Sequence, residues 1–176
     1  MLFTARAEYG VRLLVTLGRH AGGAPVSLQA IAGADGLPLG YLEHVAALLR
    51  RAGLVESTRG AHGGYRLARD PDVIFMDEAV LALEGVVAPM VCLDVADGGV
   101  EVGALRRVMC SHEADQGRGC ATRLLWARVQ DDVMKALART TLAELVEFSE
   151  RGALAGSATA VSPLPSTGRS SEPVVV

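Results

Sequence analysis

Apolar residues recur with helical spacing in three stretches near the start of the chain. The first stretch, residues 5–19, carries arginines between its apolar positions and is soon followed by two consecutive glycines that end the helix. Ser27 can cap a second, short helix over residues 28–32, because a serine hydroxyl accepts a free backbone N–H at a helix start. A third helix places four apolar residues on one face: Leu42, Val45, Leu48 and Leu49.

The second and third helices are separated by a turn over residues 35–38, and the third helix is predicted to end at Gly53. Arg50 and Arg51 lie in its last turn, where positive charge suits the helix dipole, and glycine is common just past a helix end. Two short helices joined by a tight turn that contains glycine are the sequence pattern of a helix-turn-helix.

A short β-hairpin is predicted next. Residues 54–58 and 65–68 are predicted to be its two strands, and the tip between them, residues 59–64, holds three glycines and two side chains that can carry positive charge. An ordinary αα-hairpin beside an ordinary β-hairpin is the alternative, but the order of the elements is that of a winged helix and favours DNA binding. In that geometry one helix lies in the major groove, the glycines let the tip approach a phosphate backbone, and Arg59 supplies charge.

The candidate DNA-contacting residues come from the cap of the second helix, from the third helix and from the hairpin tip: Ser27, Gly40, Tyr41, Glu43, His44, Arg51, Arg59, Gly60, His62, Gly63 and Gly64. Tyr41 and Glu43 are expected to affect base preference, since a carboxylate can accept a hydrogen bond from the amino group of cytosine. Arg59 is expected to contact a phosphate or the minor groove.

Helical periodicity returns after residue 120. Residues 121–139 place apolar side chains at helical spacing among charged ones, so this long helix can either close its own core or form a dimer interface. Thr141 and Glu144 have the spacing of a capping box, which predicts one short final helix. The residues from 152 onward are rich in Gly, Ala, Ser, Thr and Pro, which predicts a disordered tail over residues 152–176.

The composition favours a helical domain. Half of the residues are apolar but only 4% are aromatic, so the core must consist of Leu, Val and Ala, and the predicted fold is mainly α with a small β-hairpin. Residues 1–70 hold eight Arg and five acidic residues, a net charge of +3, whereas residues 71–176 carry −6. A basic first half allows a local contact with a polyanion.

Other classes of protein find little support in the sequence. No apolar run reaches the roughly 18 residues of a membrane span and no signal-peptide pattern begins the chain, so we expect a cytoplasmic protein without a membrane partner. The chain contains no GxSxG, P-loop, HExxH or CxxC motif, and its four histidines lie in separate segments. We therefore predict that it is not an enzyme.

Three cysteines, Cys92, Cys110 and Cys120, are the candidate metal ligands. An odd number of cysteines in a cytoplasmic protein argues against a disulfide framework, and ordinary buried cysteines are the simplest alternative. However, the last two cysteines bracket a polar segment that contains glycine, which packing explains poorly. Clustered thiolates suit an iron–sulfur cluster, and zinc is the competing metal because His112 could complete a four-ligand site.

Several motifs from the winged-helix region to about residue 147 can be compared with a known family: Tyr41-Leu42-Glu43, Arg51-Ala52-Gly53-Leu54-Val55, Arg59-Gly60-x-x-Gly63-Gly64-Tyr65-Arg66-Leu67-Ala68, Asp77-Glu78-Ala79-Val80, Leu83-Glu84-Gly85, Cys92 and Thr140-Thr141-Leu142-Ala143-Glu144-Leu145. Together they resemble the Rrf2-type winged-helix regulators that include IscR, NsrR and RirA. The resemblance implies a homodimeric bacterial transcription factor whose affinity for operator DNA is set by an iron–sulfur cluster or by another signal.

The same resemblance suggests a domain organisation and a ligand set. It implies a winged helix-turn-helix in residues 1–85, a cluster-binding region in 86–120, and a dimerisation helix with a short final helix in 121–151. In NsrR-like relatives the partner's first helix supplies a carboxylate ligand, and Glu8 stands at the matching place. In IscR-like relatives a histidine follows the third cysteine by three residues, where this chain has Arg123.

The cysteines here are spread more widely than the familiar family pattern, so the type of cluster, 2Fe-2S or 4Fe-4S, stays open. Glu8 of the partner subunit is favoured as the remaining ligand over His112.

Overall fold

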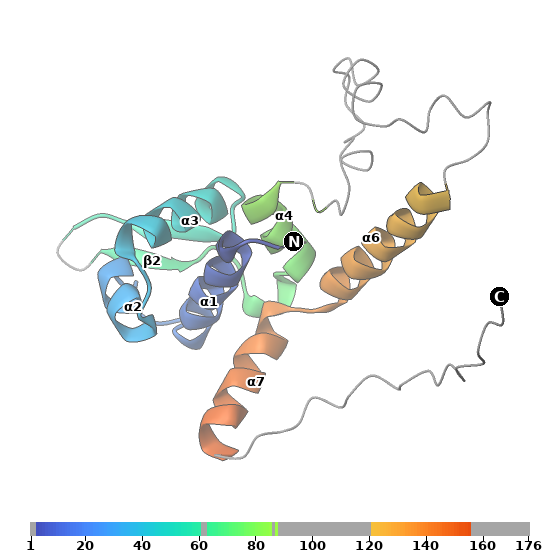
Figure 1. The fold of residues 1–176 in the computed structure, drawn as a ribbon. Coiled ribbons are helices and arrows are strands. Elements are labelled where there is room, and N and C mark those ends of the chain that lie inside the picture. Colours follow the sequence, from blue (N-terminus) through green and yellow to red (C-terminus); the bar gives the residue numbers. More distant parts are fainter. Residues whose placement is uncertain (1–2, 61–62, 86, 88–120, 156–176) are drawn as a thin grey trace.

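The computed structural model describes residues 3–60, 63–85, 87 and 121–155 of the 176-residue chain. Its elements follow one another in the order α1 (Ala5–Arg19), α2 (Leu28–Asp35), α3 (Leu39–Arg51), β1 (Val55–Thr58), β2 (Gly64–Leu67), the 3₁₀ turn η1 (Pro71–Val73), α4 (Met76–Glu84), α6 (Ala121–Arg139) and α7 (Leu142–Ala155) (Figure 1). The fold is mainly helical with one antiparallel hairpin, as the sequence predicts.

Side-chain caps fix the starts of the first two helices, and the one at Ser27 is the cap that the sequence predicts. The Thr4 hydroxyl accepts from the backbone N–H of Arg6 at the start of α1, and the Ser27 hydroxyl accepts from Ala30 at 3.1 Å at the start of α2. The second helix continues to Asp35, beyond its predicted end. Gly36 follows with φ at +66°, a left-handed conformation that favours glycine, and reverses the chain into α3.

The core lies where α1 packs against α3, α4 and α7. It is aliphatic, as the low aromatic content predicts, and its largest fully buried side chains are Leu13, Leu14, Leu17, Ile31, Leu42, Val45, Leu49, Leu54, Val55, Ile74, Leu83 and Leu142. Burying one such side chain stabilises the fold by about 1.5–3 kcal/mol relative to its exposure to water. The helix-turn-helix therefore rests on a continuous core.

The hairpin pairs Val55 with Leu67 and Thr58 with Gly64. β1 therefore begins one residue later than predicted, and β2 begins and ends one residue earlier than predicted. Residue 64 lies in β2 and not in the tip. Outside the hairpin, Val26 forms an isolated antiparallel bridge with Tyr65. The segment between α1 and α2 is thereby attached to the second strand of the wing.

The last two helices differ in how they lie relative to the core. Figure 1 shows α6 extending away from the first helices and the hairpin, and none of its residues is fully buried. Helix α7 returns to pack against α1 and begins with the predicted capping box, in which the Thr141 hydroxyl accepts from the N–H of Glu144 at 3.3 Å. No helix in the described ranges is long and apolar enough to cross a membrane.

The predicted length of the final helix was wrong. α7 has 14 residues and continues to Ala155, through the first residues of the expected disordered tail. An ion pair between Glu147 and Arg151 supports its last turns, and the Ala-Leu-Ala sequence after Gly152 has high helix propensity. The rest of the expected tail, residues 156–176, lies outside the described residues.

Candidate nucleic-acid interface

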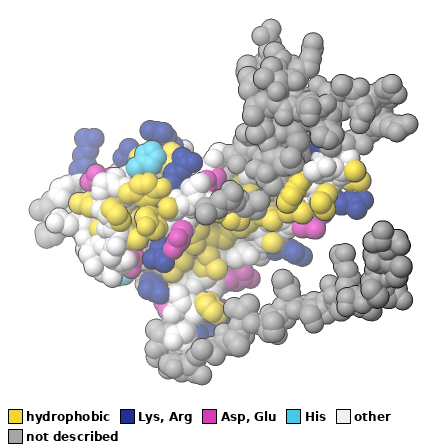
Figure 2. All heavy atoms as spheres, viewed as in Figure 1, with side chains coloured by type: hydrophobic (Ala, Val, Ile, Leu, Met, Phe, Trp, Pro, Cys, Tyr) yellow, Lys and Arg dark blue, Asp and Glu magenta, His cyan; other side chains and the backbone are white. Residues whose placement is uncertain are grey.

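Helix α3 has one buried and one exposed face. Leu42, Val45, Ala46 and Leu49 point into the core. The exposed positions recur at helical spacing on the other side, and they include four of the sequence-predicted contacts together with one residue that was not predicted: Gly40, Glu43, His44, Arg50 and Arg51. Figure 2 shows basic and histidine side chains over this edge of the domain. The geometry thus brings these candidates together on one accessible surface.

Tyr41 differs from the other α3 candidates because it is partly buried. Its ring meets that of Tyr9 edge to face, with ring centroids 5.4 Å apart and an interplanar angle of 87°. The ring of His44 also lies near that of Tyr41, with ring centroids 6.5 Å apart. Tyr41 therefore packs α3 against α1 as well as bordering the exposed face.

The basic residues near the wing fall into two groups. Arg66 pairs with Glu56 across the hairpin, and Arg69 pairs with Glu78 at 2.7 Å. Arg51 and Arg59 are exposed and have no carboxylate partner within the described part of the chain. A cation that is not already neutralised is the more effective phosphate ligand.

Arg50 was not among the predicted contacts, although it lies on the same exposed face of α3 as they do. It lies two helical turns after Glu43 on the same face, which is the signal that could have identified it. Its guanidinium donates from Nη1 to Ser57 Oγ at 3.2 Å. The contact joins the end of α3 to strand β1, and so fixes the wing relative to α3.

The glycines of the wing have different structural roles. Gly60 has φ at +116°, which strains any other residue, and it faces open space. A Cβ on Gly63 would lie 2.3 Å from the Thr58 carbonyl oxygen, and one on Gly64 would lie 2.6 Å from the Val26 backbone. Gly63 and Gly64 are thus required by close approach of the protein's own backbone. His62 lies outside the described residues.

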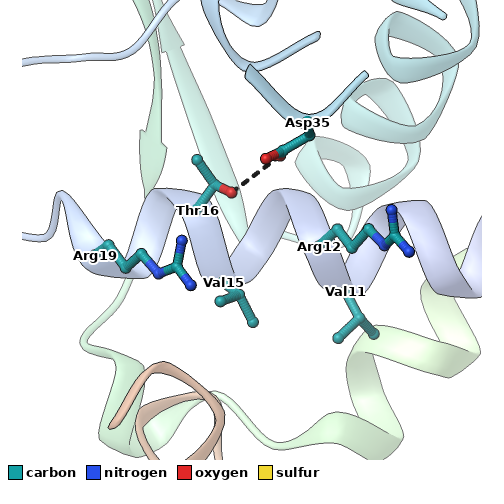
Figure 3. A pocket seen from close by; sticks show the side chains of 6 residues that line it. All are labelled: Val11, Arg12, Val15, Thr16, Arg19 and Asp35. Atoms are coloured by element: carbon teal, nitrogen blue, oxygen red, sulfur yellow. Dashed lines mark hydrogen bonds between the residues drawn. The ribbon is translucent and has the colours of Figure 1, made fainter. Parts of the chain in front are cut away.

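A shallow groove runs along α1 beside the end of α2 (Figure 3). Val11 and Val15 form part of its lining, while Arg12 and Arg19 stand along the same helix. Thr16 donates from Oγ1 to Asp35 Oδ2 at 3.2 Å, as the dashed line in Figure 3 marks. This hydrogen bond fixes α2, the first helix of the helix-turn-helix, on α1.

Among the expected metal ligands, only Glu8 lies within the described residues. It is exposed in the first turns of α1, and its carboxylate pairs with Arg12 at 2.7 Å. Cys92, Cys110, Cys120 and His112 all lie outside the described ranges. Within those ranges no three metal-binding side chains gather.

Helix α6 presents exposed apolar side chains beyond the core. Leu124 is 57% exposed and Leu125 is 56% exposed, although both are large and aliphatic. Farther along the same helix, a hydrogen bond to Asp131 and the charge of that carboxylate raise the pKa of Lys135 above its ordinary value. The helix therefore begins with exposed apolar side chains, and its second half carries charged residues beside Leu137, which packs against the core.

Comparison with known proteins gives consistent matches. The model of the Rrf2 family, described as an iron-dependent transcriptional regulator, matches residues 3–148. The chain is 32% identical over 150 residues to the HTH-type transcriptional regulator CymR of Bacillus subtilis, with 85% of this chain and 93% of that protein covered. It is 30% identical over 150 residues to IscR of Vibrio vulnificus, with 85% and 80% covered.

Solved structures show the same likeness. The structure of CymR, titled the global cysteine regulator of B. subtilis, superimposes with a TM-score of 0.64 at 32% identity and covers 84% of this chain and 98% of that one. IscR of T. potens gives a TM-score of 0.65 at 31% identity, with 86% and 90% covered.

Proposed function

The chain belongs to the Rrf2 family of transcriptional regulators, and from this premise we propose that it is a homodimer that binds operator DNA under the control of an iron–sulfur cluster. Helix α3 enters the major groove, and the hairpin tip lies against the phosphate backbone. The observation that carries the DNA-binding mode is the exposed face of α3, which ends beside a wing whose Arg59 has no carboxylate partner in the described ranges.

Each contact has a distinct part in this mode. Glu43 and His44, in the first half of α3, face the base edges, where a carboxylate selects the amino group of cytosine. Ser27 and Gly40 are exposed at the starts of the two motif helices, where backbone N–H groups attract phosphate. The sugar–phosphate backbone on either side of the major groove is contacted by Arg51, Arg59 and the open Gly60.

Dimerisation is supported by the exposed apolar beginning of α6. Leu124 and Leu125 have no cover from the described part of their own chain, and a second copy would remove them from water. A two-fold dimer also doubles the contacts of one modest helix-turn-helix, with half-sites about 34 Å apart or a multiple of that spacing.

The control by a cluster is supported by the donor set and by the family description. The chain has three cysteines, and cysteine thiolates are the usual ligands of iron–sulfur clusters. The matching family, Rrf2, is described as an iron-dependent transcriptional regulator. An exposed carboxylate at Glu8 can serve as a fourth, replaceable ligand from the partner subunit. When bound, the cluster supplies a redox-responsive iron centre. The competing proposal, a thiol- or zinc-dependent regulator, draws on the likeness to CymR.

The DNA-binding proposal is tested by selecting binding sequences from a random duplex library with the full-length chain. We expect enrichment of a two-fold symmetric sequence whose affinity falls when Glu43 or Arg59 is replaced by Ala. Recovery of sequences without a shared motif would contradict operator recognition.

The cofactor proposal is tested on anaerobically purified protein by its visible absorption spectrum with iron and sulfide analysis. Sulfur-to-iron charge-transfer bands that disappear in Cys92→Ala, Cys110→Ala or Cys120→Ala support the cluster. A colourless protein with one zinc per chain supports the competing regulator instead.

The dimer is tested by analytical ultracentrifugation of Leu125→Glu. A charge in the apolar beginning of α6 should convert the dimer to monomer, while Asp132→Asn, farther along the same exposed face, should leave it intact. A Leu125→Glu variant that remains dimeric would place the interface elsewhere.

A further inference from the structure

Glu84, the last residue of α4, makes an unusual set of contacts with the beginning of α1. Its Oε1 accepts from the Thr4 backbone N–H at 3.1 Å, from the Thr4 hydroxyl at 2.6 Å and from the Ala7 N–H at 3.2 Å. Arg6 approaches the second carboxylate oxygen at 3.7 Å, and the Glu84 side chain is only 7% exposed. A residue about 80 positions away in sequence thus completes the cap of α1.

The neighbouring residue, Leu83, fixes the same two helices against each other. A Cβ on Gly10 of α1 would lie 2.3 Å from Leu83 Cδ1, so Leu83 packs directly on this glycine and would have to move to admit a larger residue. Gly85, with φ at +80°, then ends α4. The Leu83-Glu84-Gly85 motif therefore holds the first two turns of α1 at one fixed place on α4.

The turn held in this way also contacts the recognition helix. Tyr9 lies between Ala7 and Gly10 in sequence, and its ring meets that of Tyr41 edge to face in the first turn of α3. Both rings are partly buried, so a displacement of the start of α1 moves a surface against which α3 is packed.

We propose that Glu84 is a positioning residue for DNA recognition, acting through α1 and the Tyr9–Tyr41 contact on the orientation of α3. A carboxylate suits this place because the N-terminal end of a helix attracts negative charge and its free N–H groups need acceptors. The inference rests on the proposed DNA-binding function and requires no metal.

The consequence differs from a general loss of stability. Base contacts need α3 in one orientation, whereas phosphate contacts tolerate small changes because they carry no sequence information. Loss of the Glu84 carboxylate should therefore reduce the affinity for operator DNA more than the affinity for unrelated DNA.

The test compares Glu84→Gln with Glu78→Gln in the full chain. Glu78 lies on the same helix, but its carboxylate pairs with Arg69 and caps α4 through the Phe75 N–H, away from α1. We expect Glu84→Gln to lower the ratio of operator affinity to unrelated-DNA affinity about three- to tenfold, an effect of the size seen for mutations that act on a binding site from a distance. Glu78→Gln should leave this ratio unchanged. Equal ratios in both variants would overturn the inference.

A second pair of variants tests the contact between Tyr9 and Tyr41. This test does not depend on the fold tolerating a change at Glu84. Tyr9→Leu removes the ring contact and should lower the same affinity ratio, whereas Tyr9→Phe retains the ring and should not. Hydrogen exchange of the Thr4 amide, which donates to Glu84 Oε1, should accelerate in Glu84→Gln and stay slow in both Tyr9 variants when measured by NMR.

The outcomes separate this inference from the proposed function. If the parent chain shows no operator preference, the DNA-binding proposal fails first. If the parent prefers its operator and the Thr4 amide exchanges faster in Glu84→Gln while the affinity ratio holds, the carboxylate only caps α1 and the inference is wrong.

Discussion

Val26 and Tyr65 exchange two backbone hydrogen bonds, of 2.9 and 2.8 Å, although one precedes α2 and the other lies in β2. This bridge brings the Val26 backbone directly beside Gly64. Gly64, which the sequence places at the wing tip, therefore packs against the protein's own backbone. The orientation of the wing depends on this contact.

Gly64→Ala should destabilise the fold by about 1–3 kcal/mol, the usual cost of overpacking a tight site. The matched control is Gly33→Ala in α2, where an added Cβ meets nothing within 4 Å and φ is not positive. Because alanine is the better helix former, the control should be neutral or stabilising by up to about 1 kcal/mol. Urea unfolding followed by circular dichroism measures both, and equal midpoints would contradict the packing argument.

Tyr41 should combine two effects that the exposed residues of α3 do not. Tyr41→Ala removes a partly buried ring from its contact with Tyr9, so it should cost about 1–3 kcal/mol of unfolding free energy as well as weaken DNA binding. Glu43→Ala should change stability by less than about 0.5 kcal/mol, since Glu43 is exposed. Thermal unfolding of the two variants distinguishes them, and a Tyr41→Ala variant as stable as the parent would show that the ring contact contributes nothing.

Arg59 should act through charge alone. Arg59→Ala should weaken binding to all sequences and reduce the slope of log affinity against log salt by about one. Arg19→Ala is the control, because Arg19 is also exposed but donates to Ser149 on α7, away from the wing. Fluorescence anisotropy titrations over a series of salt concentrations measure the slope. An unchanged slope in Arg59→Ala would show that Arg59 does not contact a phosphate.

Local signals explain how much of this fold could be predicted from the sequence. The ends of α1 and α6 follow from apolar periodicity and were predicted closely. The cap at Ser27 follows from a serine just before an apolar run, and the capping box at Thr141 follows from Glu144 three positions later. The end of α7 was missed because Gly152 signals a stop that the neighbouring Ala and Leu residues override.

Contacts between distant segments could not be predicted in the same way. Gly63 and Gly64 appeared to serve a close approach to DNA, because the sequence does not reveal that Val26 and Thr58 lie against them. The cap supplied by Glu84 and the packing of Tyr41 on Tyr9 likewise depend on how the helices assemble. The exposed face of α3 was largely predicted because a single helix determines it.

Glu43 should determine base preference. A carboxylate accepts from a cytosine amino group but is repelled by phosphate, so Glu43→Ala should relax the preference at one base position and strengthen some unrelated sites. The expected loss of discrimination at that position is about 1–3 kcal/mol. Affinities for a panel of single-base operator variants test this, and the same ranking in parent and variant would show that Glu43 does not read a base.

The ligand role of Glu8 can be separated from its role in α1. Its ion pair with Arg12 is exposed, with side chains 57% and 52% accessible, and such a pair contributes only about 0.3–0.5 kcal/mol. Glu8→Ala should therefore leave the unfolding midpoint of the metal-free protein nearly unchanged. Arg12→Ala removes the same ion pair and keeps the carboxylate, which makes it the matched control.

A change confined to Glu8→Ala would consequently report on ligation and not on folding. We expect this variant to retain iron and sulfide but to show a shifted visible spectrum and a shorter lifetime in air, because a carboxylate is a replaceable iron ligand. Arg12→Ala should keep the parent spectrum. If Glu8→Ala matches the parent while His112→Ala loses its colour, the histidine is the ligand, and the first helix of the partner subunit has no part in holding the cluster.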